Sequence, residues 1–106
     1  MTAGVLALQH YSPIRVGETL LLGFDFSGLV DAIVSASAVV TITRRSGTAD
    51  ADPSTMRVGT PQVAGLVVSQ MVTGRVAGAN YVLAFQVDTP DGQRFIETGI
   101  LAVRAP

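Results

Sequence analysis

The chain has 106 residues, a length that suits a single domain with a thin hydrophobic core. Hydrophobic residues make up 48% of it and charged residues only 14%, which excludes a disordered protein and indicates large neutral surfaces, as in proteins partly covered by neighbours. The formal net charge of −1 gives no general attraction for nucleic acid or for an anionic membrane. The absence of cysteine excludes disulfides, thiolate nucleophiles and cysteine metal sites.

The first ten residues, MTAGVLALQH, contain an apolar run without charges. It forms either the first strand, over residues 4–9, or an N-terminal arm at residues 1–10 that adds a strand to a neighbour's sheet. In the second case Val5, Leu6 and Leu8 are partner contacts. The run has no basic n-region and is too short for a signal peptide, and no segment is long enough to span a bilayer. We therefore expect synthesis in a cytoplasm.

The rest of the chain alternates short runs of Val, Thr, Ile, Leu and Ala with turn residues, which predicts an all-β sandwich or barrel. Pro13 and Gly17 mark a connection before the second strand. After the first, the predicted strands are residues 19–26, 33–43, 56–63, 65–73, 81–89 and 94–103. In the second strand, alternate residues would point to one face: Leu20, Leu22, Phe24, Phe26.

Two segments of this region need comment. Residues 33–43 could also form a helix, but their β-branched second half favours a strand. Residues 44–55 are rich in Gly, Asp, Ser and Pro and are the clearest predicted loop. Pro61 makes the strand at 56–63 an edge candidate.

The last two predicted strands form a hairpin, because an Asp-Gly pair at Asp91 and Gly92 lies at the centre of the turn between them. Tyr81 begins the sixth strand three residues after Gly78, and in immunoglobulin-like sandwiches a tyrosine there often turns its hydroxyl back onto the backbone of the preceding corner. Phe85 shares its face and, with Phe24, fills the predicted core. Seven strands at this spacing predict a single immunoglobulin-like antiparallel β-sandwich over residues 1–106.

The stretch Phe24-Asp25-Phe26-Ser27 is followed by further short motifs within residues 31–35, 78–81 and 89–94. Their order resembles that of the small immunoglobulin-like virion proteins of tailed bacteriophages, of the fibre-tail adaptor or head-fibre type, which carry Asp-Trp-Ser where Phe24–Ser27 stands here. The following elements of the pattern are matched by Asp31-Ala32-Ile33, Ser35, Gly78, Tyr81, Thr89 and Gly92, with Gln93-Arg94 in place of Gly-Arg. The resemblance covers residues 13–103, and most of its motifs are structural.

The resemblance implies a non-enzymatic structural component of a tailed-phage particle. Such an adaptor or connector docks tail, connector, fibre or capsid proteins, in several copies around a symmetric ring, without cofactor, nucleic acid or membrane. The final hairpin also resembles PKD and bacterial immunoglobulin-like modules of cell surfaces. The alternative function is therefore a carbohydrate- or cell-surface-binding module. Such a module would bind its ligand through exposed aromatic residues in loops, and Tyr11 near the N-terminus is the candidate for that role.

Catalytic and metal chemistry have few candidates in this sequence. His10 is the only histidine, and it would need an activated serine such as Ser12 and an orienting carboxylate to form a triad. Asp88, Asp91 and Glu97 flank the hairpin turn, but Ca²⁺ needs six or more oxygen ligands, and the turn itself explains Asp91. We therefore expect no catalytic residue, no cofactor and no metal ligand.

The predicted loop at 44–55 supplies the other candidate contacts. Arg44 and Arg45 begin it, and Asp50 and Asp52 follow. Loops on rigid sandwiches often carry function, so we expect these four side chains to contact a partner. The structural residues of the domain are expected to be Tyr81, Phe24, Phe85 and Gly92.

Overall fold

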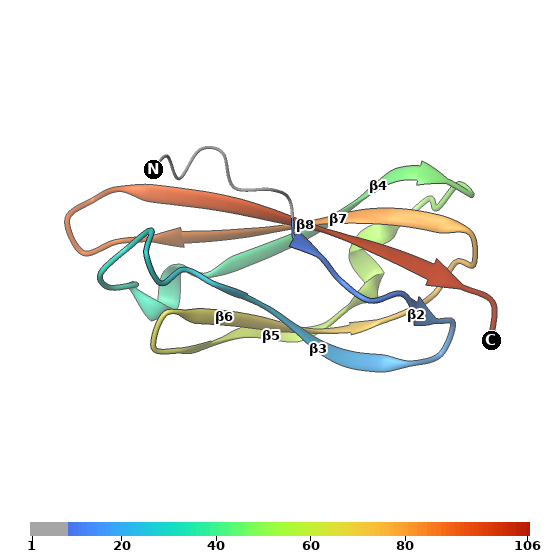
Figure 1. Cartoon of the computed structure of the whole chain (residues 1–106), viewed down its shortest axis with the longest axis horizontal. Coiled ribbons are helices and arrows are strands. Elements are labelled where there is room, and N and C mark those ends of the chain that lie inside the picture. Colours follow the sequence, from blue (N-terminus) through green and yellow to red (C-terminus); the bar gives the residue numbers. More distant parts are fainter. Residues whose placement is uncertain (1–8) are drawn as a thin grey trace.

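The computed structural model of the chain describes residues 9–106, with two short 3₁₀ turns and otherwise strands and loops (Figure 1). In chain order the elements are β1 (Gln9–His10), β2 (Ile14–Arg15), β3 (Thr19–Asp25), η2 (Ser35–Ser37), β4 (Val39–Gly47), η3 (Pro53–Met56), β5 (Arg57–Ala64), β6 (Val67–Thr73), β7 (Ala79–Asp88) and β8 (Arg94–Arg104). Among residues 9–106 no helix is long and apolar enough to cross a membrane.

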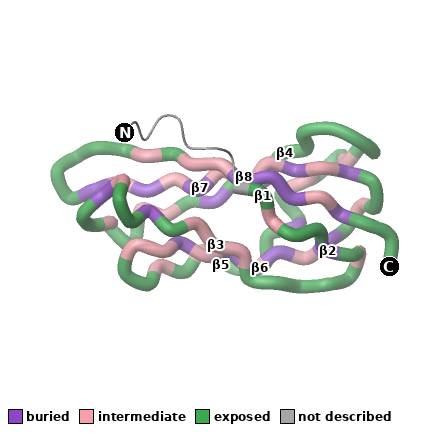
Figure 2. Tube along the Cα trace, viewed as in Figure 1, coloured by how far each residue is buried: buried purple, intermediate pink, exposed green. Residues whose placement is uncertain are grey.

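Strand β7 shows why the chain folds as strands. Its side chains alternate strictly between buried and partly exposed, so one face of the strand lies in the core. The buried face carries Tyr81, Leu83, Phe85 and Val87, as the sequence predicts. Fully burying each of these large apolar side chains contributes about 1.5–3 kcal/mol to folding. The strand at the centre of its sheet therefore supplies much of the core, which Figure 2 shows in purple.

The strands form two sheets that pack face to face as a β-sandwich. In the first sheet the order is β1-β8-β7-β4, and β2 also pairs with β8. In the second the order is β3-β6-β5. Strands β1 and β2 run parallel to β8, whereas every other pairing is antiparallel. The prediction of an all-β sandwich is confirmed.

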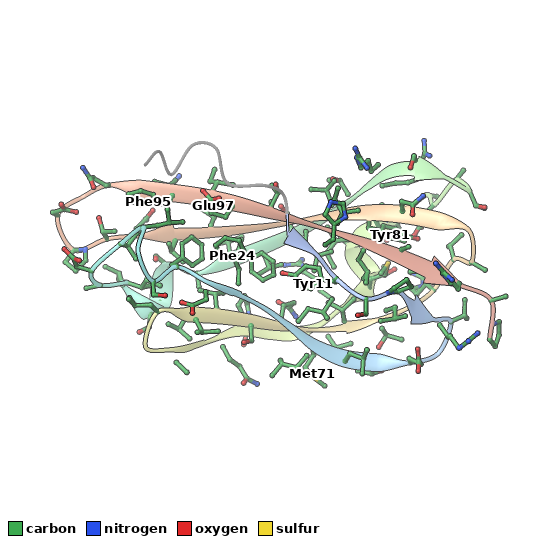
Figure 3. The ribbon with its side chains drawn as sticks, viewed as in Figure 1. Tyr11, Phe24, Met71, Tyr81, Phe95 and Glu97 are labelled. Carbon is green, nitrogen blue, oxygen red and sulfur yellow. The ribbon has the colours of Figure 1, made fainter. Side chains whose placement is uncertain are left out.

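Aromatic side chains join the two sheets at the middle of the sandwich. The rings of Phe24 and Phe26 from the second sheet lie 4.9 Å apart, centroid to centroid, and those of Phe24 and Phe85 lie 6.2 Å apart. Tyr11 extends this row, 6.5 Å from Phe85, and its hydroxyl donates to the Gly23 carbonyl oxygen at 2.8 Å. Figure 3 shows Phe24 and Tyr11 between the sheets. Phe24 and Phe85 have the expected core role.

The β7–β8 hairpin closes as predicted, through a turn in which the Gly92 amide donates to the Thr89 carbonyl at 3.0 Å. Gly92 has φ +89°, in the left-handed region that other residues rarely adopt, so its structural role agrees with the prediction. Asp91 does not have a positive φ. Its carboxylate accepts a hydrogen bond from the Thr89 hydroxyl instead.

The predicted strand at 33–43 is wrong in its first half, which contains the turn η2 before β4 begins at Val39. Ser37 explains the turn, because its hydroxyl donates to the Val34 carbonyl oxygen and accepts from the Asp88 amide at 2.8 Å. Serine competes for backbone groups in this way and disfavours regular strands. No helix forms there beyond this single turn.

The predicted loop at 44–55 is wrong at its start. Strand β4 continues through Gly47 and pairs with β7, with Arg44 opposite Tyr81 and a register shift at Arg45. The turn η3 ends the segment. Arg44 and Arg45 therefore lie near the end of a strand, Arg44 paired with Tyr81 and Arg45 at the register shift.

Two more expectations near the N-terminus change. The connection expected between Pro13 and Gly17 contains the short strand β2, because Ile14 is buried against the sheets and its backbone pairs with Val103. Of the four side chains expected on one face of the second strand, Phe26 is buried and follows the end of β3, and Leu20 is exposed near its start. Residues 4–8, with Val5, Leu6 and Leu8, lie outside the described residues.

The sandwich is elongated, with principal extents of 42 × 29 × 20 Å. The β7–β8 turn lies at one end of the long axis, and the C-terminus and the end of β4 lie at the other (Figure 1). The two sheets are stacked along the intermediate axis (Figure 1). The molecule therefore has two broad sheet faces and two narrow ends.

Candidate functional site

The end of β4 and the loop after it gather four of the predicted contact residues at one end of the molecule. Arg44 and Arg45 lie in the last four residues of β4, and Asp50 and Asp52 follow in the loop before η3. The loop is held by its own hydrogen bonds, since the Asp52 amide donates to the Asp50 carboxylate at 2.9 Å. The structure thus brings together residues that the sequence placed only in one segment.

Tyr81 anchors this loop to the core. Its ring is fully buried, and its hydroxyl donates to the Asp50 carboxylate at 2.8 Å. Burial raises the pKa of Tyr81 and the bond to Asp50 raises it further. The pKa of Asp50 is lowered, first by the Asp52 amide and then by the Tyr81 hydroxyl. The expected corner bond from Tyr81 to backbone is therefore replaced by a bond to a carboxylate 31 residues away.

Arg44 and Arg45 beside this loop form no salt bridge within residues 9–106. The Arg44 guanidinium donates to the Gly47 carbonyl oxygen at 3.0 Å, and Arg45 makes no side-chain hydrogen bond with any residue in 9–106. Within the same residues, the ion pair between Arg94 and Asp88 is the one salt bridge, and it lies at the other end. The Arg45 guanidinium in particular is therefore available to pair with a group of another molecule.

The opposite end holds a cavity of about 310 Å³ between the loop after β3 and the β7–β8 turn. Asp31 and Asp91 lie on its walls, and Leu29, Pro90 and Phe95 give it an apolar lining. Its volume is at the lower limit of ligand pockets, which usually hold 300–1,000 Å³. It can accept a side chain or a small polar group.

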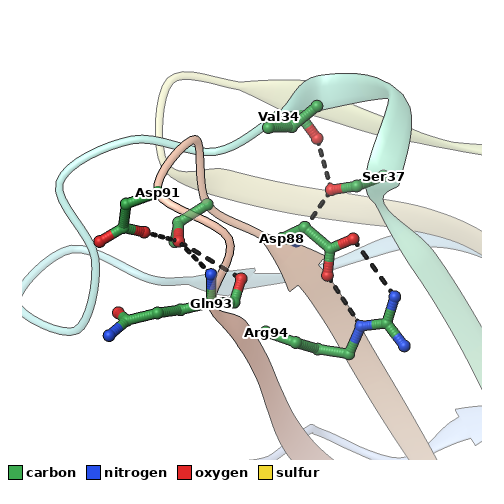
Figure 4. Close-up of polar contacts among 7 residues, drawn as sticks. Val34, Ser37, Asp88, Asp91, Gln93 and Arg94 are labelled. Carbon is green, nitrogen blue, oxygen red and sulfur yellow. Dashed lines mark hydrogen bonds and ion pairs between the residues drawn. The ribbon is translucent and has the colours of Figure 1, made fainter.

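Polar contacts stiffen this end (Figure 4). The Arg94 guanidinium donates to both Asp88 carboxylate oxygens, at 2.8 and 3.3 Å, and these bonds lower the pKa of Asp88. The Thr89 hydroxyl accepts from the Gln93 amide at 3.1 Å. Asp88 and Asp91 thus already have protein partners. Within residues 9–106 no three or more His, Cys, Asp or Glu side chains gather as a metal site.

The outer faces of both sheets are neutral along their middles. We define the β4–β7–β8 face by its outward side chains, which are Val39, Thr41, Thr43, Val82, Ala84, Gln86, Ile96 and Thr98. The β3–β6–β5 face has Leu21, Gly23, Val58, Gln62, Ser69 and Met71. None of these residues is charged, so the charges lie elsewhere on the molecule.

Each neutral face carries a row of side chains directly across three strands. On the β4–β7–β8 face, Val39, Gln86 and Ile96 are register partners, with Ile96 54% and Val39 41% exposed. The row on the other face joins Leu21, Met71 and Val58, with Leu21 51% and Val58 45% exposed. Met71 points outward from its sheet in Figure 3. The row on the β3–β6–β5 face is apolar throughout, and in the row on the β4–β7–β8 face two apolar side chains flank Gln86. Clusters of exposed apolar side chains mark interaction surfaces.

The remaining predicted candidates do not form a site. His10 is exposed on β1, and its side chain makes no hydrogen bond with residues 9–106. Tyr11 lies between the sheets, where burial raises its pKa to about 12, so it is not an exposed aromatic for a ligand. Comparison with known protein families, with curated proteins and with solved structures finds no match to this chain.

The sequence did not predict that the sheet faces are uncharged along their middles while the charged residues lie elsewhere. The outward residues Val82, Ala84 and Gln86 of β7 are uncharged, but their alignment with the side chains of β4 and β8 depends on the strand register. The cavity joins residues that lie about 60 positions apart in the chain. The rows of exposed side chains across neighbouring strands can be recognised only when the strand register is known.

Proposed function

We propose that the chain is a non-enzymatic structural protein of a tailed-bacteriophage particle, an immunoglobulin-like adaptor or connector that docks neighbouring tail, connector, fibre or capsid proteins. The two neutral faces, each with exposed apolar side chains and no charge along its middle, are the observation that carries this proposal. A sandwich with a docking surface on both sides can be held between two neighbours. The motif order described above supports placing it in a virion.

Strand order supports the immunoglobulin-like assignment. In such domains the strands of one sheet follow the order B-E-D and those of the other include C-F-G. Here β3-β6-β5 has the first order, and β4-β7-β8 has the second. The buried tyrosine near the start of β7 has the place of the corner tyrosine, although its hydroxyl has a different partner.

The size of the faces supports stable docking. With the sheets stacked along the 29 Å axis (Figure 1), a sheet face measures 42 × 20 Å, at most roughly 840 Å², close to the ~800 Å² per partner that a standard interface buries. Burying uncharged side chains avoids the desolvation cost of unpaired charges. A neutral, flat face is therefore suited to an interface that is formed once during assembly.

The proposal is tested by quantitative mass spectrometry of particles purified from the phage or prophage that encodes the chain. We expect the chain in the particles at a constant copy number, from a few to a few dozen. Its absence from particles that contain the other head and tail proteins would contradict the proposal. Binding of the free domain to glycans in that case would favour the carbohydrate-binding alternative.

A further inference from the structure

The charges of this chain are separated along its long axis. The acidic end, around the β7–β8 turn, carries Asp25, Asp31, Asp88 and Asp91 against Arg94, a formal side-chain charge of −3. The basic end, around the end of β4, carries Arg15, Arg44, Arg45, Arg75 and Arg104 against Glu18, Asp50 and Asp52, a formal charge of +2. Arg57 and Glu97 lie between the two ends.

The two ends of one molecule do not neutralise each other. They are separated along an axis of 42 Å, several times the Debye length of ~8–10 Å at physiological ionic strength. The ion pair within residues 9–106 joins Asp88 to Arg94 and lies inside the acidic end. The net charges of −3 at the acidic end and +2 at the basic end can therefore be paired only by another molecule.

The cavity of the acidic end fits an arginine side chain. Asp31 and Asp91 can accept from a guanidinium, and the apolar lining with Pro90 and Phe95 can pack on the methylene stem. The planar guanidinium suits such a site better than an ammonium. Arg45 at the other end is exposed and, within residues 9–106, forms no side-chain hydrogen bond, so it is available as the inserted residue.

We infer that the partner at these ends is a second copy of this chain, bound head to tail, with Arg45 of one copy entering the Asp31–Asp91 cavity of the next. Contacts of this kind join unlike surfaces and repeat, so they build a ring or a filament. An end measures 29 × 20 Å, at most roughly 580 Å², below the ~800 Å² per partner of standard interfaces. Each contact is therefore weak, and several copies are held together by closure or by their neighbours.

This inference extends the proposed function, because a structural protein in several copies needs a contact between copies. It differs from that function in the surface used, which is the charged ends and not the neutral faces. The two can therefore fail separately, and variants of the ends and of the faces distinguish them.

The test reverses the charge of each end in turn. The variant with Arg44→Glu and Arg45→Glu has two acidic ends, and the variant with Asp31→Arg and Asp91→Arg has two basic ends. Sedimentation velocity over a range of protein concentrations measures association at low and at high salt. We expect the wild-type chain to associate at high concentration, with an association constant that falls at least tenfold between the two salt levels.

Each reversed variant alone should associate at least tenfold more weakly than the wild-type chain, because like charges then face each other. An equimolar mixture of the two should regain association, as should the chain with all four substitutions. This recovery also shows that the variants are folded. Ser12→Glu, on the exposed connection between β1 and β2 and off both neutral faces, is the control and should associate as the wild-type chain does. Ile96→Glu, on the neutral β4–β7–β8 face, reports whether the copies meet on that face instead.

Three results would overturn the inference. The first is a wild-type chain that stays monomeric at every concentration at low salt. The second is self-association that both reversed variants retain, or that their mixture does not recover. The third is association that Ile96→Glu abolishes, which would place the contact between copies on the neutral face and leave the proposed docking function standing.

Discussion

Tyr81 and Tyr11 are the residues whose chemistry the fold changes most. Each ring is held in the sandwich and each hydroxyl donates to an acceptor on another segment, Asp50 for Tyr81 and Gly23 for Tyr11. A phenolate could not donate either bond, and burial penalises its charge. The two tyrosines thus connect the outer loop and the β3 edge to the core through their protonated forms.

This protonation predicts how stability depends on pH. Burial raises the pKa of Tyr11 to about 12, and the pKa of Tyr81 is also raised, from the usual value of 10.0. The unfolded chain loses these protons first, so the free energy of unfolding is fully maintained below pH 10 and falls as the pH rises from there through the folded pKa values.

Ultraviolet absorbance of tyrosinate measures the two titrations directly, because the chain has two tyrosines and no tryptophan. The folded protein should show little tyrosinate at pH 10, whereas the chain in denaturant should be half ionised there. Tyr81→Phe should leave a single transition near pH 12, from Tyr11. Half-ionisation of the folded wild-type chain near pH 10 would show that neither hydroxyl is held as described.

At the scale of elements, the segment from β1 to β2 locks the two sheets together. Its backbone pairs with β8 of the first sheet, and Tyr11 reaches the free edge of β3 in the second. Gly99 makes this crossing possible, because a Cβ at that position would collide with the Tyr11 ring. The glycine is required for close approach of the ring to β8.

Gly99→Ala should therefore destabilise the protein by about 1–3 kcal/mol, the usual cost of overpacking a filled site. Chemical denaturation with urea measures the change. Gly59→Ala, another glycine-to-alanine change, cannot serve as the control, because Gly59 has φ +72° and an alanine there would be strained even with open space around it. Ser12→Ala, on the exposed connection between β1 and β2, is the matched control and should change stability by less than about 0.5 kcal/mol. An unchanged Gly99→Ala variant would mean that Tyr11 does not occupy this position in solution.

The elements also show what the sequence can predict. Strong alternation predicted β7 and its inward residues, and the Asp-Gly turn predicted the hairpin with β8. The prediction failed where a side chain competes with the backbone, as Ser37 does before β4, and where pairing extends a strand beyond an apolar run, as at Arg44. It also missed the bond between Tyr81 and Asp50, because contacts across 31 residues leave no local pattern.

At the scale of the whole molecule, charged and uncharged surfaces lie on different sides. The ends carry the excess charges, and the two sheet faces are uncharged along their middles. This division is not visible in the composition, because a net charge of −1 averages an acidic and a basic end. The low share of charged residues did indicate neutral surfaces, and the fold gathers them into two faces.

Incorporation of face variants into particles tests the central claim most directly. Ile96→Glu and Leu21→Glu each replace an exposed apolar side chain of one neutral face by a charge, and Ser12→Glu places the same charge off both faces. Thermal unfolding should show that all three are folded, since all three positions are exposed. The copy number per particle is then measured by quantitative mass spectrometry for each variant and for the wild-type chain.

Docking through the neutral faces predicts that Ile96→Glu and Leu21→Glu each reduce the copy number at least tenfold, because an unpaired charge would be buried in the interface at a cost well above the ~1.4 kcal/mol that a tenfold change requires. Ser12→Glu should be incorporated as the wild-type chain is. A fall for one face variant alone would restrict docking to that face. Incorporation of both face variants at the wild-type level would contradict the account.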